Sequence, residues 1–168
     1  MNWSKSAVAR PWKRKFLGYS VTVHREPKLK VAQQSALRLK SHLRRILRRG
    51  RGRNLVSVIA ELSQVLRGWV AYFRLVEVRG ILGELDAWIR RKLRCILWRQ
   101  WKRPRTRLRK LRQFGLEQSR AQISAYNGRG PWWNSGASHM NQAVPTRMLH
   151  RFGLVNLLDE HRRLARYS

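Results

Sequence analysis

The sequence predicts a mainly α-helical protein: a three-helix bundle with a short N-terminal β-strand segment and a C-terminal extension of short helices. Apolar residues recur at spacings of three and four through the middle of the chain, which is the period of an amphipathic helix. Glycine and proline interrupt this pattern where helices would end. The 168 residues, 43% of them hydrophobic, suffice for one compact domain with an appendage.

The best-defined helix is expected at residues 55–73. Asn54 can cap its N-terminus, because an asparagine side chain accepts hydrogen bonds from free backbone N–H groups there. Residues 54–89 carry three basic and four acidic residues, so this near-neutral segment is expected at the buried centre. The apolar stripe comprises Leu55, Val58, Ile59, Leu62, Val65, Leu66, Trp69 and Phe73.

Two further helices flank this one. The preceding helix should end at Gly50 and Gly52, inside a basic turn. Its apolar stripe is Leu39, Leu43, Ile46 and Leu47, and its polar face carries Ser41, Arg44, Arg45 and Arg48. In the following helix, Glu84 and Asp86 are expected in the first turn, where the helix dipole favours negative charge. The stripe of that helix is Leu82, Leu85, Trp88, Ile89, Leu93, Ile96 and Leu97.

The two ends of the chain have other patterns. Residues 15–23 are rich in aromatic and β-branched residues, which predicts a strand that Pro27 closes. Short helical segments follow Pro104, at residues 106–114, 116–126, 146–152 and 155–166. Between them, residues 127–138 (NGRGPWWNSGAS) predict a loop that contains two adjacent tryptophans.

Charge is the extreme feature of the composition. The chain has 38 basic and 8 acidic residues, a formal net charge of +30. Residues 31–53 contain eight basic and no acidic residues, and residues 90–112 contain twelve and none. Solvated faces normally mix both signs. Self-repulsion on this scale destabilises a compact state unless a polyanion binds, and nucleic acid is the natural candidate because phosphates accept Lys and Arg.

The tryptophans leave alternatives open. Trp88 is predicted to be a core aromatic of the third helix. Trp98 falls on the far side of that helix among cations, so either the C-terminal segment covers it or it stacks on an unpaired base. Trp101 could take either role. Trp132 and Trp133 either lock the C-terminal segment onto the bundle or form a platform beside Arg129.

Several function classes are disfavoured. Cys95 is the only cysteine, which excludes an internal disulfide and suits a reducing compartment. No apolar run reaches the length of a membrane span, and the N-terminus lacks the apolar core of a signal peptide, so a cytoplasmic location is expected. His139, His150 and His161 lack a second cysteine or clustered carboxylates, so neither a metal site nor a cofactor is expected.

Four stretches resemble a known family. They are AVARPWKRKFLGYSVT, LRGWVAYFR, LDAWIRRKLRCILWRQWKRPRTRLRKL and GRGPWWNSGASHMNQA. Together they are similar to the C-terminal part of bacterial group II intron reverse transcriptase/maturases, over nearly the whole chain. The resemblance implies the maturase-specific or X domain, a thumb-like helical bundle that binds intron RNA and helps it reach its splicing-active fold. It also implies that residues 10–22 correspond to the final palm strand.

The departures from that family concern catalysis. Its polymerases hold two metal ions with the carboxylates of a Tyr-Ala-Asp-Asp motif. This chain has two aspartates, Asp86 and Asp159, in separate segments. The fingers and most of the palm have no counterpart in the sequence. We therefore expect no enzyme activity and no catalytic residue.

The resulting prediction has three segments. Residues 1–30 would be a remnant of the last palm strand region, residues 31–104 the maturase bundle, and residues 105–168 a basic extension with a Trp-rich loop. The protein would bind group II intron RNA and assist folding and splicing without catalysing chemistry. The alternatives are the thumb of a split or truncated reverse transcriptase and a decayed mobile-element remnant. Target DNA or a separate reverse transcriptase chain would be further partners, and no membrane is expected.

The predicted RNA contacts are cationic or aromatic residues of the basic segments and of the Trp-rich loop. They are Lys13, Arg14, Lys15, Arg44, Arg45, Arg48, Arg51, Arg53, Arg90, Arg91, Arg94, Trp98, Lys102, Arg103, Arg105, Arg107, Arg109, Lys110, Arg129, Trp132 and Trp133.

Overall fold

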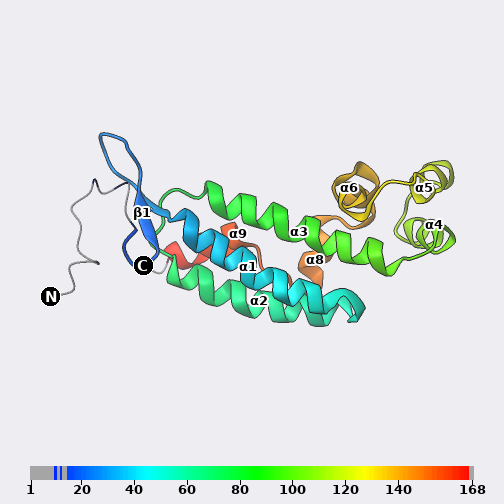
Figure 1. Ribbon diagram of the computed structural model, residues 1–168, viewed down its shortest axis with the longest axis horizontal. Helices are drawn as coiled ribbons and strands as arrows, with labels where there is room; N and C mark the ends of the chain where they lie inside the picture. Colours follow the sequence, from blue (N-terminus) through cyan, green and yellow to red (C-terminus); the bar gives the residue numbers. More distant parts are fainter. Residues whose placement is uncertain (1–9, 11, 13–14, 167–168) are drawn as a thin grey trace.

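The computed structural model describes residues 10, 12 and 15–166 of the chain. Three long helices form its centre: α1 (Gln33–Arg49), α2 (Leu55–Tyr72) and α3 (Gly80–Gln100). They lie roughly side by side along the length of the molecule, and the short helices α4, α5 and α6 gather at one end (Figure 1). The prediction of a mainly helical bundle with a small β segment is confirmed.

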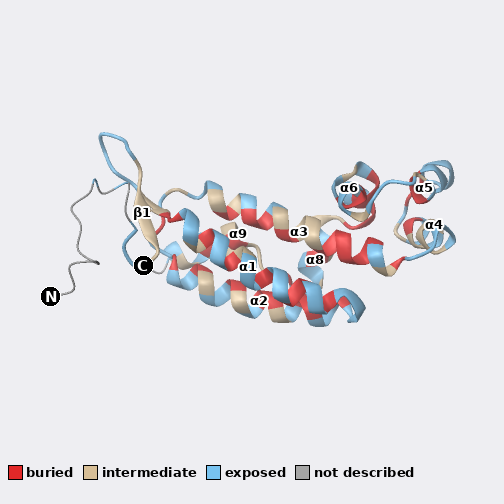
Figure 2. Ribbon diagram, in the orientation of Figure 1, coloured by how far each residue is buried: buried red, intermediate tan, exposed pale blue. Residues whose placement is uncertain are grey.

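Local sequence explains where the bundle helices begin and end. The Asn54 side chain accepts a hydrogen bond of 2.8 Å from Val56 N, as a capping residue should. The α1 helix stops at Gly50, the start of the short 3₁₀ helix η3 (Gly50–Gly52). The apolar stripes of the three helices face one another, and Leu43, Leu62 and Leu85 are fully buried. Buried residues line the facing sides of these helices in Figure 2.

A two-stranded antiparallel sheet lies at the other end of the bundle. Strand β1 (Tyr19–Val21) falls within the predicted strand, but β2 (Leu29–Val31) was not predicted. Tyr19 pairs with Val31 in the register of this sheet. Two side-chain contacts fix the sheet to α2 and to the connection that follows it. The Tyr19 hydroxyl donates to Tyr72 O (2.5 Å), and the Glu77 carboxylate accepts from Leu29 N (2.7 Å).

The C-terminal extension consists of short helices. These are α4 (Pro104–Gln113), α5 (Gln118–Ala125), α6 (Pro131–Gly136), α7 (Ser138–Ala143), α8 (Thr146–Arg151) and α9 (Leu157–Ala165). The prediction of a loop over residues 127–138 is wrong for its second half. Pro131 occupies the first turn of α6, a position where its missing N–H costs nothing, and so the proline begins a helix here.

The last helix joins the bundle, packing against both α2 and α3. Asp86 makes the connection: its carboxylate accepts from Leu157 N (2.9 Å) and Leu158 N (3.3 Å) at the start of α9. The prediction that Glu84 and Asp86 lie in the first turn of the third helix is wrong, because α3 begins earlier, at Gly80. Asp86 instead accepts hydrogen bonds from backbone N–H groups at the N-terminus of α9.

Most of the second half of α3 is buried. Six consecutive residues, 93–98, are buried, whereas a surface helix buries one stripe only. The bundle covers one side of this segment. The extension covers the other, with α6 packed along α3. This enclosure decides which members of the basic segment 90–112 reach solvent.

Candidate nucleic-acid interface

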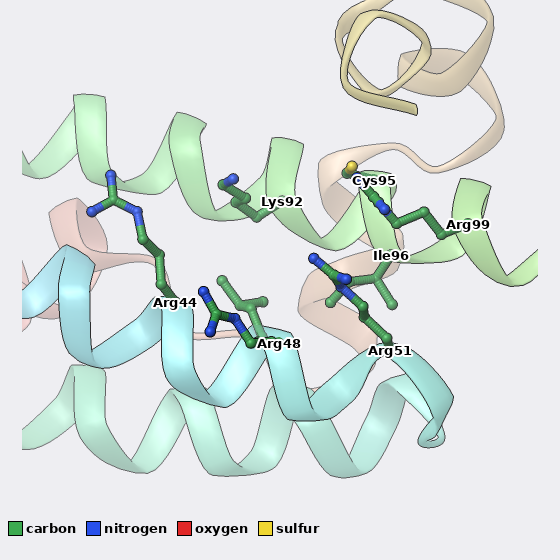
Figure 3. Close-up of a pocket in the computed structure, with 8 residues that line it drawn as sticks. Arg44, Arg48, Arg51, Lys92, Cys95, Ile96 and Arg99 are labelled. Atoms are coloured by element: carbon green, nitrogen blue, oxygen red, sulfur yellow. The ribbon is translucent and has the colours of Figure 1, made fainter. Parts of the chain in front are cut away.

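A groove runs between α1 and α3 on the surface of the bundle. Five cations surround it, and buried Leu47, Cys95 and Ile96 form its apolar base. The cavity has a volume of about 180 Å³. Figure 3 shows side chains from both helices and from η3 directed into this space. We call it the α1–α3 groove, and its cations are Arg44, Arg48, Arg51, Lys92 and Arg99.

The α1–α3 groove has no acidic lining residue. Glu61, on α2, pairs instead with Arg53 (2.7 Å) and Arg49 (3.6 Å), neither of which lines the groove. Within the described part of the chain, no ion pair joins a groove cation to a carboxylate. Phosphate oxygens of a polyanion would supply the missing partners, which is the chemistry that Lys and Arg clusters favour.

Trp88 lies at the edge of this groove, half-buried. Cations from both helices surround its ring: Arg44 Cζ is 5.6 Å, Lys92 Nζ 5.7 Å and Lys40 Nζ 6.0 Å from the centroid. The prediction that Trp88 is a core aromatic is therefore wrong in part. The ring packs on the core from the margin of the apolar stripe and offers its remaining surface to the basic face.

Trp98 is fully buried, so the prediction that it contacts RNA is wrong. The C-terminal extension covers it, as the alternative interpretation held. Arg107 Cζ from α4 lies 4.7 Å from its ring centroid, and the His139 ring from α7 lies 5.5 Å away. Trp101 is also buried, stacked against Phe114 at 5.8 Å. Of the two tryptophans of α3, Trp98 is therefore the fully buried one, and Trp88 is only partly buried.

Arg94 is buried as well, and the prediction of an RNA contact there is wrong. Its Nε donates to Val144 O at 2.9 Å, and burial lowers the pKa of its guanidinium. Arg107 is half-buried, and its Nε donates to Trp101 O at 2.9 Å. Burial lowers its pKa too. Both arginines hold the extension against α3.

Other predicted contacts occupy separate places. Arg45 lies over the opposite side of α1, toward Trp69 of α2, and Arg53 pairs with Glu61. Arg91 donates to Trp132 O at 3.1 Å. Among the predicted contacts, Lys15 near the sheet is exposed. The predicted contacts on or beside α4 that are exposed are Lys102, Arg103, Arg105 and Arg109. Arg90 and Lys110 are half-buried, and Arg129, Trp132 and Trp133 are exposed. Lys13 and Arg14 lie outside the described residues.

Two groove residues were missed by sequence reasoning, Lys92 and Arg99. Both belong to the acid-free segment 90–112, and a spacing of seven places them on one face of α3. Their position relative to α1 depends on helix packing, which this spacing does not reveal. Arg44, Arg48 and Arg51 were predicted, and the fold brings these three to the same groove.

Neither a metal site nor a membrane span emerges from residues 10, 12 and 15–166. No group of three or more His, Cys, Asp or Glu side chains is close enough there to hold a metal ion. No helix in that part of the chain has the length and apolar character needed to cross a membrane.

Sequence comparison identifies the segment that builds the groove. The family model described as "Group II intron, maturase-specific domain" matches residues 36–115. Residues 36–115 are therefore similar to a group II intron maturase-specific domain. The matched segment runs from α1 through α4 and includes every residue of the α1–α3 groove. No curated protein matched the sequence.

The maturase-specific domain is distinct from the polymerase catalytic part of these proteins. The match supports a group II intron maturase-related function. Within the maturase-specific segment, the groove is the place where cations from two helices converge. The helices α5 to α9 lie beyond the matched residues.

Proposed function

We propose that the protein binds group II intron RNA through the α1–α3 groove and assists its folding and splicing, while the RNA performs the chemistry. The observation that carries this proposal is the convergence of five cations without a carboxylate in the groove. A compact RNA brings phosphates close together, and cations held on a rigid scaffold lower the cost of that repulsion. Such contacts position an RNA without reading its sequence.

A matched pair of double variants tests the groove. Arg44→Gln/Arg48→Gln removes two groove cations spaced four residues apart on α1. Arg147→Gln/Arg151→Gln removes two exposed arginines with the same spacing on α8. Affinity for a group II intron RNA is measured across a salt series. The negative slope of log K against log salt should lose about 1.4 to 1.8 of its magnitude in the groove variant and stay unchanged in the α8 variant.

Splicing is the second readout. Adding the protein to the purified intron RNA at limiting Mg²⁺ should raise the spliced fraction, and the groove variant should raise it less than the α8 variant does. Equal binding to an unrelated structured RNA, with no effect on splicing, would indicate nonspecific affinity and contradict the proposal. Primer extension by highly purified protein would contradict its non-catalytic part.

A further inference from the structure

The exposed Trp132 ring lies directly beside the α1–α3 groove. Lys92 Nζ is 4.5 Å from the Trp132 centroid and 5.7 Å from that of Trp88, and Lys92 also lines the groove. One cation thus joins the groove to the indole ring of Trp132, a residue that is 41% exposed. We propose that Trp132 stacks on an unpaired RNA base whose neighbouring phosphate lies in the groove. This proposal rests on the proposed function and specifies the kind of RNA that the groove takes.

The ring is held in place by contacts that do not bury it. Arg91 Cζ lies 4.0 Å from the Trp132 centroid, and its Nη2 donates to Trp132 O. The guanidinium of Arg91 also lies against Gly136, where a Cβ atom would come within 2.9 Å of Cζ. Gly136 therefore allows α6 to approach Arg91 closely. Arg91 and Lys92, both from α3, thus lie against the ring, and Trp132 still remains exposed.

The helix that carries the ring is also rigid. The Asn134 side chain is fully buried and donates to Arg129 O (2.8 Å) and Gly130 O (3.1 Å). Asn127 donates to Asn134 Oδ1 at 2.7 Å, which ties the preceding turn to α6. A ring fixed before binding loses little conformational entropy when a ligand stacks on it. This is the arrangement expected of a binding platform.

An unpaired base is the ligand that this surface favours. Stacking on an aromatic ring requires an exposed base face, and in a duplex each base face is covered by its neighbours. Cations next to the ring attract the phosphate of the same nucleotide, and Lys92 is placed to contact both parts. A duplex could use the groove cations but not the ring.

Trp133 provides a matched control. It follows Trp132 on α6 and is 47% exposed, a similar fraction. Its neighbours are Arg129, with Cζ at 5.0 Å, and His139, with ring centroids 6.3 Å apart. Neither lines the α1–α3 groove. Both tryptophans were predicted as RNA contacts, but if stacking depends on the shared cation Lys92, replacing Trp133 should weaken binding less than replacing Trp132.

The experiment measures binding of the full chain to a short single-stranded RNA and to the blunt duplex formed with its complement. Trp132→Ala should weaken single-strand binding roughly 5- to 150-fold and change duplex binding less than about twofold. Trp133→Ala should weaken single-strand binding less than Trp132→Ala does. Because Arg91 donates to the backbone oxygen of residue 132 and Asn134 anchors α6, we expect Trp132→Ala to fold, which a thermal melt checks.

Trp132→Phe is the second variant, since it keeps an aromatic ring. It should retain most of the single-strand affinity but lose much of the fluorescence quenching that a base causes when it stacks on indole. Equal losses for single strand and duplex in Trp132→Ala, or an equal effect of Trp133→Ala, would overturn the stacking proposal. Failure of the unmodified protein to bind either RNA would instead overturn the proposed function.

Discussion

Arg94 Nε donates a hydrogen bond of 2.9 Å to the carbonyl oxygen of Val144, inside the protein. Arg94 belongs to the most basic segment of the chain, yet only 7% of it is exposed. The bond joins α3 to the turn after α7, and so to the C-terminal extension. Within this segment, cations therefore divide into those that hold the fold and those that face solvent.

Replacing Arg94 should affect stability rather than RNA binding. Arg94→Ala removes a charge-assisted hydrogen bond and leaves Val144 O without that donor, which should lower the free energy of unfolding by about 2 kcal/mol. Arg94→Met keeps the apolar stem and separates the loss of the head group from lost packing. Thermal or urea denaturation measures both variants.

Arg48 is the control for that prediction. It is exposed in the groove, so Arg48→Gln should leave the unfolding midpoint nearly unchanged and reduce the salt slope of RNA binding by about 0.7 to 0.9. A reduced salt slope in folded Arg94→Ala protein would show that the buried guanidinium reaches RNA after all.

The two tryptophans of α3 should also behave differently. Trp98 is fully buried between α3, α4 and α7, so Trp98→Ala should cost roughly 3–5 kcal/mol of stability. Trp88 is half-buried under cations at the groove edge, and Trp88→Ala should cost less than half of that. Chemical denaturation of both variants decides the order. A larger loss for Trp88→Ala would contradict the burial described here.

Periodicity predicted the bundle well, because the core of three packed helices depends on local apolar spacing. The cap at Asn54 and the stop at Gly50 are equally local. The same reasoning failed for Trp98, because its side of α3 is polar in the sequence. That side is covered by residues more than forty positions away along the chain, such as His139.

For the candidate site too, local sequence patterns could be predicted, but contacts between distant segments could not. The arginines of α1 could be predicted from an acid-free run, but their convergence with Lys92 and Arg99 depends on how α1 packs on α3. Likewise, the sequence marks Trp132 as an unusual loop residue. That Lys92 joins it to the groove follows only from the packing of α6 on α3.

Replacing the two glycines of the basic turn by alanine should change the stability of the protein in different ways. A Cβ at Gly50 would lie 2.8 Å from a methyl carbon of Val58, which is fully buried and has no room to move. Gly50→Ala should therefore cost about 1–3 kcal/mol of stability. A Cβ at Gly52 meets nothing within 4 Å, so Gly52→Ala should be neutral or stabilise by up to about 1 kcal/mol. Equal midpoints in urea denaturation would contradict this contrast.

Buried histidines should make the RNA-free protein less stable in mild acid. Burial lowers the pKa of both His139 and His161 below the usual value of about 6.5. The positive charge of Arg120 lowers the pKa of His139 further, and that of Arg79 lowers the pKa of His161. The unfolded chain then binds more protons than the folded one as the pH falls through 6.5 toward the lowered pKa values. The free energy of unfolding is therefore highest above pH 6.5 and declines below it, by at most about 1.4 kcal/mol per pH unit for each histidine.

Denaturation between about pH 5.5 and 7.5 measures this decline, with glutamine replacing one histidine at a time. His139→Gln and His161→Gln should each flatten the pH dependence. The contribution of Asp86 to this pH dependence has the opposite sign. Burial raises the pKa of Asp86, so the folded state holds its proton more tightly than the unfolded state does. Its contribution is common to all variants and cancels when each is compared with the unmodified protein. An unchanged slope in both buried-site variants would mean that these histidines already take up protons in the folded state.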